Sequence, residues 1–289
     1  MSTHWRGYLQ LVRAPALFTA LSNAAAAHLV ATEGAVVWSA LVPLALASAA
    51  LLAAGMALND CFDREVDARE RPARPLPSGA VPVATAWSLG FGLLAAGVAL
   101  AALAGLRSML VAATLAAAIL LYDGVLKNTW VGPLAMGTCR YLNWLLGLSV
   151  VVLTPAAWLV PVPVLVYVTS LTVLSRAEVA AGDRRLVVIA GAGFAGTAAS
   201  IAGLWAAGIV TQLAALPLAA VALAVWLGLV TRCYREHTPP VIQAAVGKLI
   251  MGLVPLDVLL VLGRDVWWGL VLVVFMIPGR WLGRRLYVT

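Results

Sequence analysis

The feature that most limits how this chain can fold is a succession of long apolar runs separated by short polar turns. Many of these runs come close to the about 20 residues that a helix needs to cross the hydrocarbon core of a bilayer. Charged residues make up only 11% of the chain and hydrophobic residues 63%, whereas a soluble domain has about 25% charged residues. The runs are uniformly apolar, which excludes the alternating pattern of a transmembrane β-barrel. We therefore predict an all-α, polytopic membrane helical bundle that occupies residues 1–289 as a single domain.

The apolar runs predict nine spans in order along the chain, and a shorter run follows them. The nine predicted spans are approximately residues 15–31, 41–58, a stretch within 82–106, 109–122, 131–153, 157–174, 186–209, 213–230 and 247–262. A last apolar run, 266–277, precedes a tail with three arginines. If that tail lies on the same side as the N-terminus, this run crosses as a tenth span. The bundle is therefore expected to have nine or ten transmembrane helices.

Basic residues are shared unequally between the two sets of turns. The turns after the second, fourth, sixth and eighth predicted spans carry the charge, and of the nineteen Lys and Arg residues only Arg107 and Arg264 fall in the other set. The positive-inside rule assigns the charged side to the cytoplasm. We therefore expect an integral protein of the plasma or inner membrane with its polar turns, and its active site, facing the cytoplasm. Its expected partners include the lipid bilayer and no nucleic acid.

The densest polar block, residues 59–79, begins where the second apolar run ends. If the helix continues into this block, Asp60, Asp63 and Asp67 fall at i, i+3 and i+7 and share one face. Neighbouring carboxylates repel one another unless a cation lies between them, and Mg²⁺ takes oxygen ligands together with phosphate oxygens. Arginines in the same block can pair with a polyanion. The block therefore predicts a magnesium–diphosphate site, and a solvated cytoplasmic loop is the alternative.

Two charged residues lie well inside predicted spans, away from the ends of the spans. Arg140, with Asn143 one turn later, lies in the fifth span, and Asp257 lies in the ninth. A charge at the centre of a membrane helix costs about 2.5–3.5 kcal/mol, so it must face the interior of the bundle and find a partner. Arg140 is expected either to bind diphosphate or to pair with a carboxylate, for which Asp257 is a candidate. For Asp257 itself, structural pairing and contact with a second substrate both remain open.

The pattern NDxxDxxxD followed by RPxRPxPSG resembles the first aspartate-rich motif of the UbiA family of intramembrane prenyltransferases. The resemblance implies a prenyltransferase that uses Mg²⁺ to transfer a prenyl group from an isoprenyl diphosphate to a small-molecule acceptor, which the sequence does not identify. It also implies that the three aspartates serve catalysis and bind the metal, with substrate contacts nearby. The matching positions are Asn59, Asp60, Asp63 and Asp67, and in the tail Arg71 and Arg74.

Other parts of the sequence resemble further elements of that family. Tyr122 and Lys127, in YDGVLKN, are spaced like the family's Tyr–Lys pair beside the diphosphate, and an interfacial Tyr with a snorkelling Lys is the alternative. Asn23, ten residues after Arg13, resembles a helix Asn near the N-terminus of the family, and it is expected to contact substrate or a neighbouring helix. The segment from Tyr122 to Asn143 also resembles the EboC-like branch of the family.

The polar island 175–185 occupies the place of the family's second aspartate motif but departs from its pattern. Glu178 and Asp183 are five residues apart, which does not place them on one helix face. The resemblance implies that they supply a second metal anchor, and that Arg176 contacts substrate phosphate. A charged loop is the alternative.

Two other functions remain open beside prenyl transfer. An intramembrane terpene cyclase could use the same scaffold and the same diphosphate chemistry without an acceptor. A transporter or lipid-binding protein is the non-enzymatic alternative, but transporters place their polar groups near the bilayer midplane, whereas most polar residues here gather at one edge.

Overall fold

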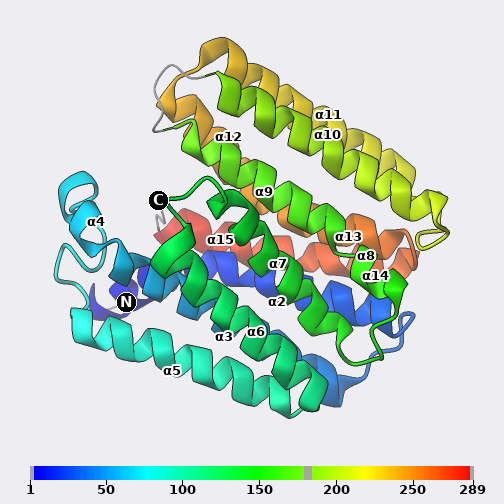
Figure 1. Ribbon diagram of the computed structural model, residues 1–289, viewed down its shortest axis with the longest axis horizontal. Helices are drawn as coiled ribbons and strands as arrows, with labels where there is room; N and C mark the ends of the chain where they lie inside the picture. The colour runs from blue at the N-terminus through cyan, green and yellow to red at the C-terminus, as the bar shows by residue number, and fades with distance from the viewer. Residues whose placement is uncertain (1–2, 179–183, 287–289) are drawn as a thin grey trace.

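The computed structural model describes residues 3–178 and 184–286 as a bundle of helices (Figure 1). A π-helical turn, η1, and a short 3₁₀ segment, η2, interrupt the α-helices. The elements are α1 (Thr3–Leu11), α2 (Ala14–Ala31), α3 (Trp38–Phe62), α4 (Arg64–Glu70), α5 (Val83–Ala102), α6 (Leu106–Leu121), η1 (Tyr122–Leu126), α7 (Gly132–Leu148), α8 (Pro155–Leu159), α9 (Val162–Arg176), α10 (Arg185–Ala206), α11 (Ala215–Glu236), α12 (Pro239–Met251), α13 (Leu253–Leu262), α14 (Val266–Leu272), η2 (Val273–Phe275) and α15 (Met276–Leu286).

Within the described residues, nine helical segments are long and apolar enough to cross a membrane, and the last of them is Val266–Gly283. The helix α7 has 17 residues and packs against α2, α6 and α9 inside the bundle. The amide of Gln10 in α1 donates to the carbonyl of Leu286 at 2.8 Å, so the last helix returns to the end where the chain begins. With α7 included, ten helical segments of the described chain run between the two ends of the bundle.

Several helix ends differ from the boundaries that hydropathy predicts. The second span is longer at both ends, Trp38–Phe62 against the predicted 41–58, whereas α7 ends at Leu148 instead of continuing to 153. The polar residues 231–236, expected in a turn, form the last turns of α11, where Arg232 and Glu236 make an i,i+4 ion pair at 2.8 Å. Polar residues end an apolar run without ending a helix, because a helix that leaves the membrane keeps its internal hydrogen bonds.

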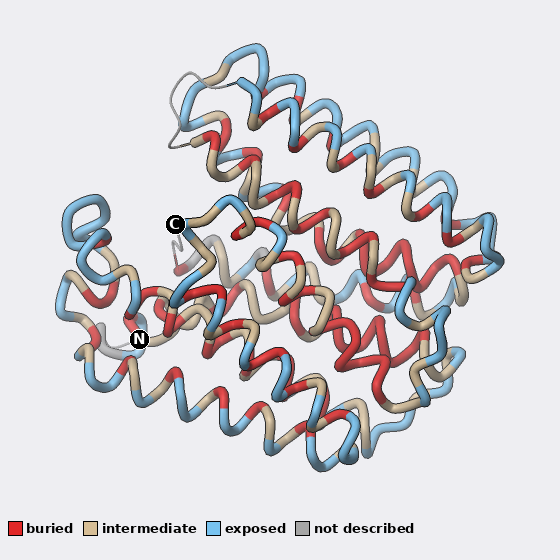
Figure 2. The backbone as a smooth tube through the Cα atoms, in the orientation of Figure 1, coloured by how far each residue is buried: buried red, intermediate tan, exposed pale blue. Residues whose placement is uncertain are grey.

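The helices differ in how much of their surface the bundle covers. Figure 2 shows buried residues concentrated on the central helices and exposed residues on α5, α10 and α11 at the margins. One core cluster surrounds Trp144, Tyr167 and Phe194, and a second lies between α3, α5 and α6. In α5, a β-carbon at Gly90 would come within 2.6 Å of Leu58, so the missing side chain is what lets α5 approach α3 this closely. The exposed apolar faces of the outer helices are those that lipid would cover.

The two ends of the bundle have different character. At the left of Figure 1 lie the start of the chain, α4 and the loop that follows α4, and most of the acidic block lies on α4 and this loop. At the opposite end lie the short connections after α2, α5, α7, α10 and α13. This arrangement places the polar block 59–79 and η1 at one end, as the alternating charge of the turns predicts.

Candidate functional site

A cavity of about 600 Å³ opens at the polar end and continues into the apolar bundle. Its walls come chiefly from α3, α6, η1, α7 and α12. Polar residues at its mouth include Asn59, Asp63, Arg71, Arg74 and Lys127, and apolar residues deeper in the walls include Leu51, Leu115, Ile119, Met136 and Ile250. The cavity therefore joins a charged rim to an apolar chamber.

The acidic residues of the first block lie where α3 gives way to α4. Asp63 stands between the two helices, but the i→i+4 hydrogen bonds continue through it, from the Asp63 amide to Asn59 and from the Asp67 amide to Asp63, at 3.0 and 2.9 Å. Asn59, Asp63 and Asp67 therefore follow one another at intervals of one turn, and Asp60 is offset from that row. Asp60 and Asp67 are buried, and Asp63 lines the cavity.

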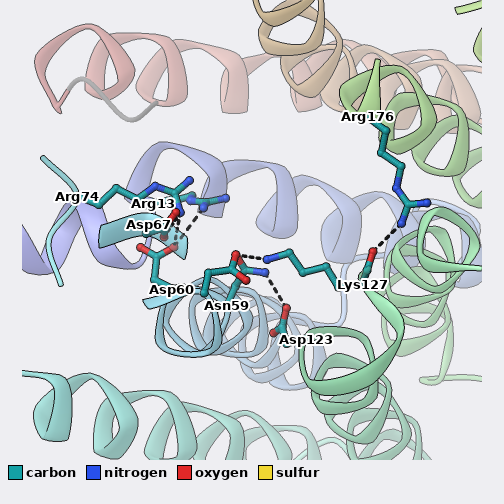
Figure 3. A network of polar contacts seen from close by, with 9 residues as sticks. Arg13, Asn59, Asp60, Asp67, Arg74, Asp123, Lys127 and Arg176 are labelled. Carbon is teal, nitrogen blue, oxygen red and sulfur yellow. Dashed lines mark hydrogen bonds and ion pairs between the residues drawn. The ribbon is translucent and has the colours of Figure 1, made fainter. Parts of the chain in front are cut away.

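Two arginines neutralise the buried pair of carboxylates, as Figure 3 shows. Arg74 contacts Asp67 at 2.5 Å and Asp60 at 3.4 Å, and Arg13 contacts Asp60 at 3.3 Å. Burial lowers the pKa of the Arg13 guanidinium and the Asp60 carboxylate acts in the opposite direction, but arginine remains a cation at physiological pH. The three aspartates thus do not face one common point. Asp60 and Asp67 share Arg74, and Asp63 faces another partner.

That partner is Lys127, which the π-helical turn η1 presents to α3. The amide of Lys127 donates to the carbonyl of Tyr122 at 2.8 Å, the five-residue spacing of a π turn. The Lys127 ammonium forms an ion pair with Asp63, and the Asn59 amide donates to Asp123 at 2.8 Å. Single π turns occur often at functional sites, because they re-aim side chains that an α-helix would direct elsewhere. Here the turn brings Tyr122, Asp123 and Lys127 to the cavity wall.

Arg176 supports this turn from α9 instead of lining the cavity. Its Nη2 donates to the carbonyls of Lys127 and Thr129 at 2.6 and 2.8 Å (Figure 3). A β-carbon at Gly132 would collide with this guanidinium, so glycine is required where the loop meets Arg176. In this structure Arg176 therefore positions the segment that carries Lys127. Of the two predicted acidic residues that follow, Glu178 lines the cavity, and Asp183 lies outside the described residues.

A second polar group of residues lies deeper, between α2, α7 and α13. Asp257 accepts hydrogen bonds from Ser22 at 2.7 Å, from Asn23 at 2.6 and 2.8 Å, and from Trp144 at 3.0 Å. Arg140 donates to Thr19 at 3.1 Å and to the Asn23 carbonyl oxygen at 3.4 Å. Direct pairing of Arg140 with Asp257, one of the two alternatives for Arg140, is therefore absent from the ion pairs of the described chain, because the side chain of Asn23 lies between them. Asn143 lies in the same group and accepts from Ser48 at 2.7 Å.

The profile of the UbiA prenyltransferase family matches residues 20–252 of the 289. The chain belongs to the UbiA prenyltransferase family. This UbiA-family chain is 43% identical, over 96 residues, to digeranylgeranylglyceryl phosphate synthase of Metallosphaera sedula, a match that covers 33% of this chain and 34% of the relative. The chain spans about a third to a half of the length of the curated relatives it matches.

Solved structures share the fold over almost the whole UbiA-family chain. A structure described as digeranylgeranylglyceryl phosphate synthase superposes with a TM-score of 0.70 at 18% identity and covers 90% of this chain and 98% of that one. A UbiA homologue from Archaeoglobus fulgidus, described as bound to GPP and Mg²⁺, superposes with a TM-score of 0.65 at 16% identity and covers 92% and 99%. At these identities the likeness establishes the fold, an integral membrane bundle of helices.

The polar rim of this UbiA-family protein fits a magnesium ion in donor chemistry. Among the described residues no group of three or more His, Cys, Asp or Glu side chains converges on one point. The rim nevertheless offers the hard oxygen donors that Mg²⁺ prefers, since Asn59, Asp63, Asp123 and Glu178 all line the cavity. One carboxylate oxygen of Asp123 is buried without a hydrogen-bond partner. The residue types at the rim therefore suit a hydrated cation that brings phosphate oxygens with it.

The structure brings most of the predicted site residues to one cavity and adds others. The predicted residues that line it are Asn59, Asp63, Arg71, Arg74, Tyr122, Lys127, Arg140, Asn143 and Glu178, whereas Asp60, Asp67, Asn23 and Arg176 contact lining residues or the loop behind them. Sequence reasoning missed Arg13, Asp123 and Gln243, which also line it. Asp123 directly follows Tyr122 in YDGVLKN, and its place within the predicted Tyr–Lys segment could have marked it as a site residue. Gln243 offered no signal, because a single amide in an apolar run marks no chemistry.

Proposed function

We propose that this protein is a magnesium-dependent enzyme that transfers a prenyl group from an isoprenyl diphosphate to an acceptor and releases diphosphate. The observation that carries the proposal is the cavity of about 600 Å³, which has a cationic and carboxylate rim at one end and an apolar chamber at the other. An isoprenyl diphosphate has the same two halves. Family membership and the names of the curated relatives support the same reaction.

The cations of the rim would bind the diphosphate and stabilise the charge that it gains as it leaves. Lys127, Arg71 and Arg74 all line the mouth of the cavity. Fixed cations aimed at developing negative charge lower the barrier, because they need no reorganisation when the bond breaks. The Lys127–Asp63 and Arg74–Asp67 pairs hold these cations in place before substrate arrives.

Magnesium is proposed to bind among the carboxylates of the rim. Asp63 and Glu178 line the cavity and are the best placed of the predicted ligands in the described chain, with Asp60, Asp67 and Asp183 as the other members of the predicted set. When bound, the ion supplies Lewis-acid neutralisation of phosphate oxygens. Asp60 and Asp67 would contribute only if Arg13 and Arg74 turned toward the diphosphate. The carboxylates and guanidiniums of the rim are thus expected to exchange partners on binding.

The apolar chamber would hold the prenyl chain and protect the reacting carbon from water. Leu51, Leu115, Ile119 and Ile250 line this part of the cavity. The bond between the allylic carbon and the diphosphate oxygen breaks with its electron pair on the oxygen. A nucleophilic atom of the acceptor forms the new bond to carbon and loses its proton to the released diphosphate. Exclusion of water prevents hydrolysis of the reactive carbon.

Purified protein in detergent tests the proposal. The assay would contain Mg²⁺, labelled geranylgeranyl diphosphate and a lipid extract, with diphosphate release and prenylated products measured by mass spectrometry. Metal-dependent release and a prenylated product are expected, and both should be lost in Asp63→Asn. The matched control is Asp265→Asn, at the opposite end of the bundle, where the carboxylate caps α14 through the Trp268 amide at 3.0 Å. No metal-dependent release by the wild type would refute the proposal, and a cyclised hydrocarbon formed without acceptor would establish the cyclase instead.

A further inference from the structure

The interior of the bundle holds a guanidinium whose charge is incompletely matched. Arg140 is 9% exposed, and its contacts go to a neutral hydroxyl and a neutral amide oxygen, Thr19 at 3.1 Å and Asn23 at 3.4 Å. Among the described residues no carboxylate lies within ion-pair distance of it. Arg140 also lines the cavity. The guanidinium N–H groups that do not contact Thr19 or Asn23 therefore face the space in which substrates would bind. A buried cation with spare donors in a cavity wall is suited to bind an anion.

Asp257 does not take that place. Both of its oxygens are occupied by donors from Ser22, Asn23 and Trp144, and it lies on the far side of Asn23 from Arg140. Because Asp257 accepts from the nitrogen of the Asn23 amide, the oxygen of that amide is left to face Arg140 and Asn143. Asp257 therefore orients Asn23, and Asn23 holds Arg140. Asp257 and Asn23 thus fix the Arg140 guanidinium at the cavity wall, and no carboxylate of the described chain neutralises it by direct contact.

Arg140 is separated from the cations of the rim. Arg13, at the start of α2, belongs to the rim through Asp60, whereas the contacts of Arg140 on α2 are six and ten residues further along. At the rise of an α-helix these positions lie about 9 and 15 Å beyond Arg13 along the helix axis. On α7, Arg140 is eight residues, or about 12 Å, from the first residue of the helix. A diphosphate held between Asp63 and Lys127 would therefore leave Arg140 for another anion.

We propose that Arg140 binds an anionic group of the acceptor, a phosphate or a carboxylate, inside the cavity. The inference rests on the prenyl transfer proposed above and specifies its second substrate as an amphiphile with a negatively charged group. The planar guanidinium matches the two oxygens of either anion. Asn143 on the same wall and Gln243 on α12 also line the cavity and add amide donors for the same ligand. Arg140 thus selects the acceptor, while the rim selects the donor.

The test compares charged and uncharged acceptors of equal shape. The donor is labelled geranylgeranyl diphosphate with Mg²⁺, and the acceptor pairs are geranylgeranylglyceryl phosphate against geranylgeranylglycerol, and 4-hydroxybenzoate against 4-hydroxybenzyl alcohol. We expect transfer to an anionic member with kcat/KM at least about tenfold above that of its neutral partner. Arg140→Met should raise KM for the anionic acceptor about 10- to 100-fold, the loss expected for charge-assisted hydrogen bonds. Arg140→Lys should recover part of that loss, since it keeps the charge but not the fork.

Two controls separate this role from folding and from the donor site. Arg107→Met removes an exposed arginine at the opposite end of the bundle, which contacts the Ser149 carbonyl at 3.3 Å, and it should leave both substrates unaffected. In Arg140→Met, KM for the diphosphate and KM for the neutral acceptors should change far less than KM for the anionic acceptor.

The possible outcomes all bear on the proposal. Failure of the wild type to release diphosphate refutes the transfer reaction itself, and the acceptor inference with it. With release intact, equal or better use of the neutral acceptors overturns the inference alone. So does an Arg140→Met variant whose losses are equal for charged and neutral acceptors, because a structural role predicts that result. Diphosphate release with no transfer to either anionic acceptor counts against it as well.

Discussion

The protein has two polar groups of residues within one bundle, and they hold their charges in different ways. The rim group consists of Arg13, Asn59, Asp60, Asp63, Asp67, Arg74, Asp123 and Lys127, and in it Asp60, Asp63 and Asp67 each contact an arginine or a lysine. The interior group consists of Thr19, Ser22, Asn23, Ser48, Arg140, Asn143, Trp144 and Asp257, and its two charges are held by hydroxyl, amide and indole groups.

The difference follows from what each group has to do. Ion pairs at the mouth of a cavity can exchange one ionic partner for another, so a rim built from them can accept a charged ligand at little net cost. A fully buried carboxylate such as Asp257 has no access to solvent, and neutral donors fix it in place because losing any of them leaves an unpaired polar group. The rim is therefore expected to control activity, and the hydrogen bonds around Asp257 to control stability. Substitutions in each group test that division.

Replacing Asp63 should show most clearly that the rim group controls activity and not stability. Asp63→Asn removes the carboxylate that pairs with Lys127 at the cavity mouth, and diphosphate release should fall by about 10³-fold or more. The melting temperature should change little, because Asp63 is only partly buried. Steady-state release of diphosphate and differential scanning fluorimetry measure the two effects. A variant that is inactive only because it has unfolded would contradict the division.

Replacing Asp257 should instead lower the stability of the bundle. Asp257→Leu leaves Ser22, Asn23 and Trp144 without their acceptor, and unfolding free energy should drop by about 3 kcal/mol. Denaturation of the purified protein in detergent measures the loss. Glu236→Leu, which breaks an exposed ion pair, is the matched control and should cost less than about 1 kcal/mol. Equal effects of the two changes would show that the interior group does not stabilise the bundle.

Removing Arg176 should weaken the rim indirectly. Arg176→Ala frees the carbonyls of Lys127 and Thr129, and the resulting misplacement of Lys127 should reduce kcat/KM for the diphosphate about tenfold. Arg232→Ala, an exposed arginine of α11, serves as the control and should keep wild-type kinetics. If Arg176 instead bound diphosphate directly, as the family resemblance implies, Arg176→Lys would keep most of the activity, whereas a guanidinium bridging two carbonyls is not replaced by an ammonium.

The smallest effect is expected from the Tyr122 hydroxyl. Tyr122→Phe keeps the ring in the cavity wall and removes only one donor, so the rate of diphosphate release should fall by less than about tenfold. Tyr141→Phe is a matched control, because that hydroxyl donates to the Trp158 carbonyl at 2.8 Å. A loss as large as that of Asp63→Asn would show that the hydroxyl takes a direct part in ionisation.

Much of the fold and part of the site were predictable from the sequence. The apolar runs gave the order of the helices, and the acidic block and YDGVLKN identified two of the elements that meet at the cavity. The partners of the carboxylates were not predictable, since Arg13 and Asp60 are 47 positions apart and either could have faced elsewhere. Opposite charge offered Asp257 as one possible partner of Arg140, but no direct contact joins the two in the described chain, because Asn23 reaches both from α2.

By itself the sequence determined that the chain forms apolar helices with its charge at one end, because hydropathy and helix length are properties of contiguous residues. The tertiary structure alone decided which polar groups share a cavity: the π turn that brings Lys127 to Asp63, the contact of Arg74 with both Asp60 and Asp67, and the placement of Arg140 at the wall. Those outcomes depend on how distant helices pack, and the pattern of residues within any one helix does not specify its neighbours.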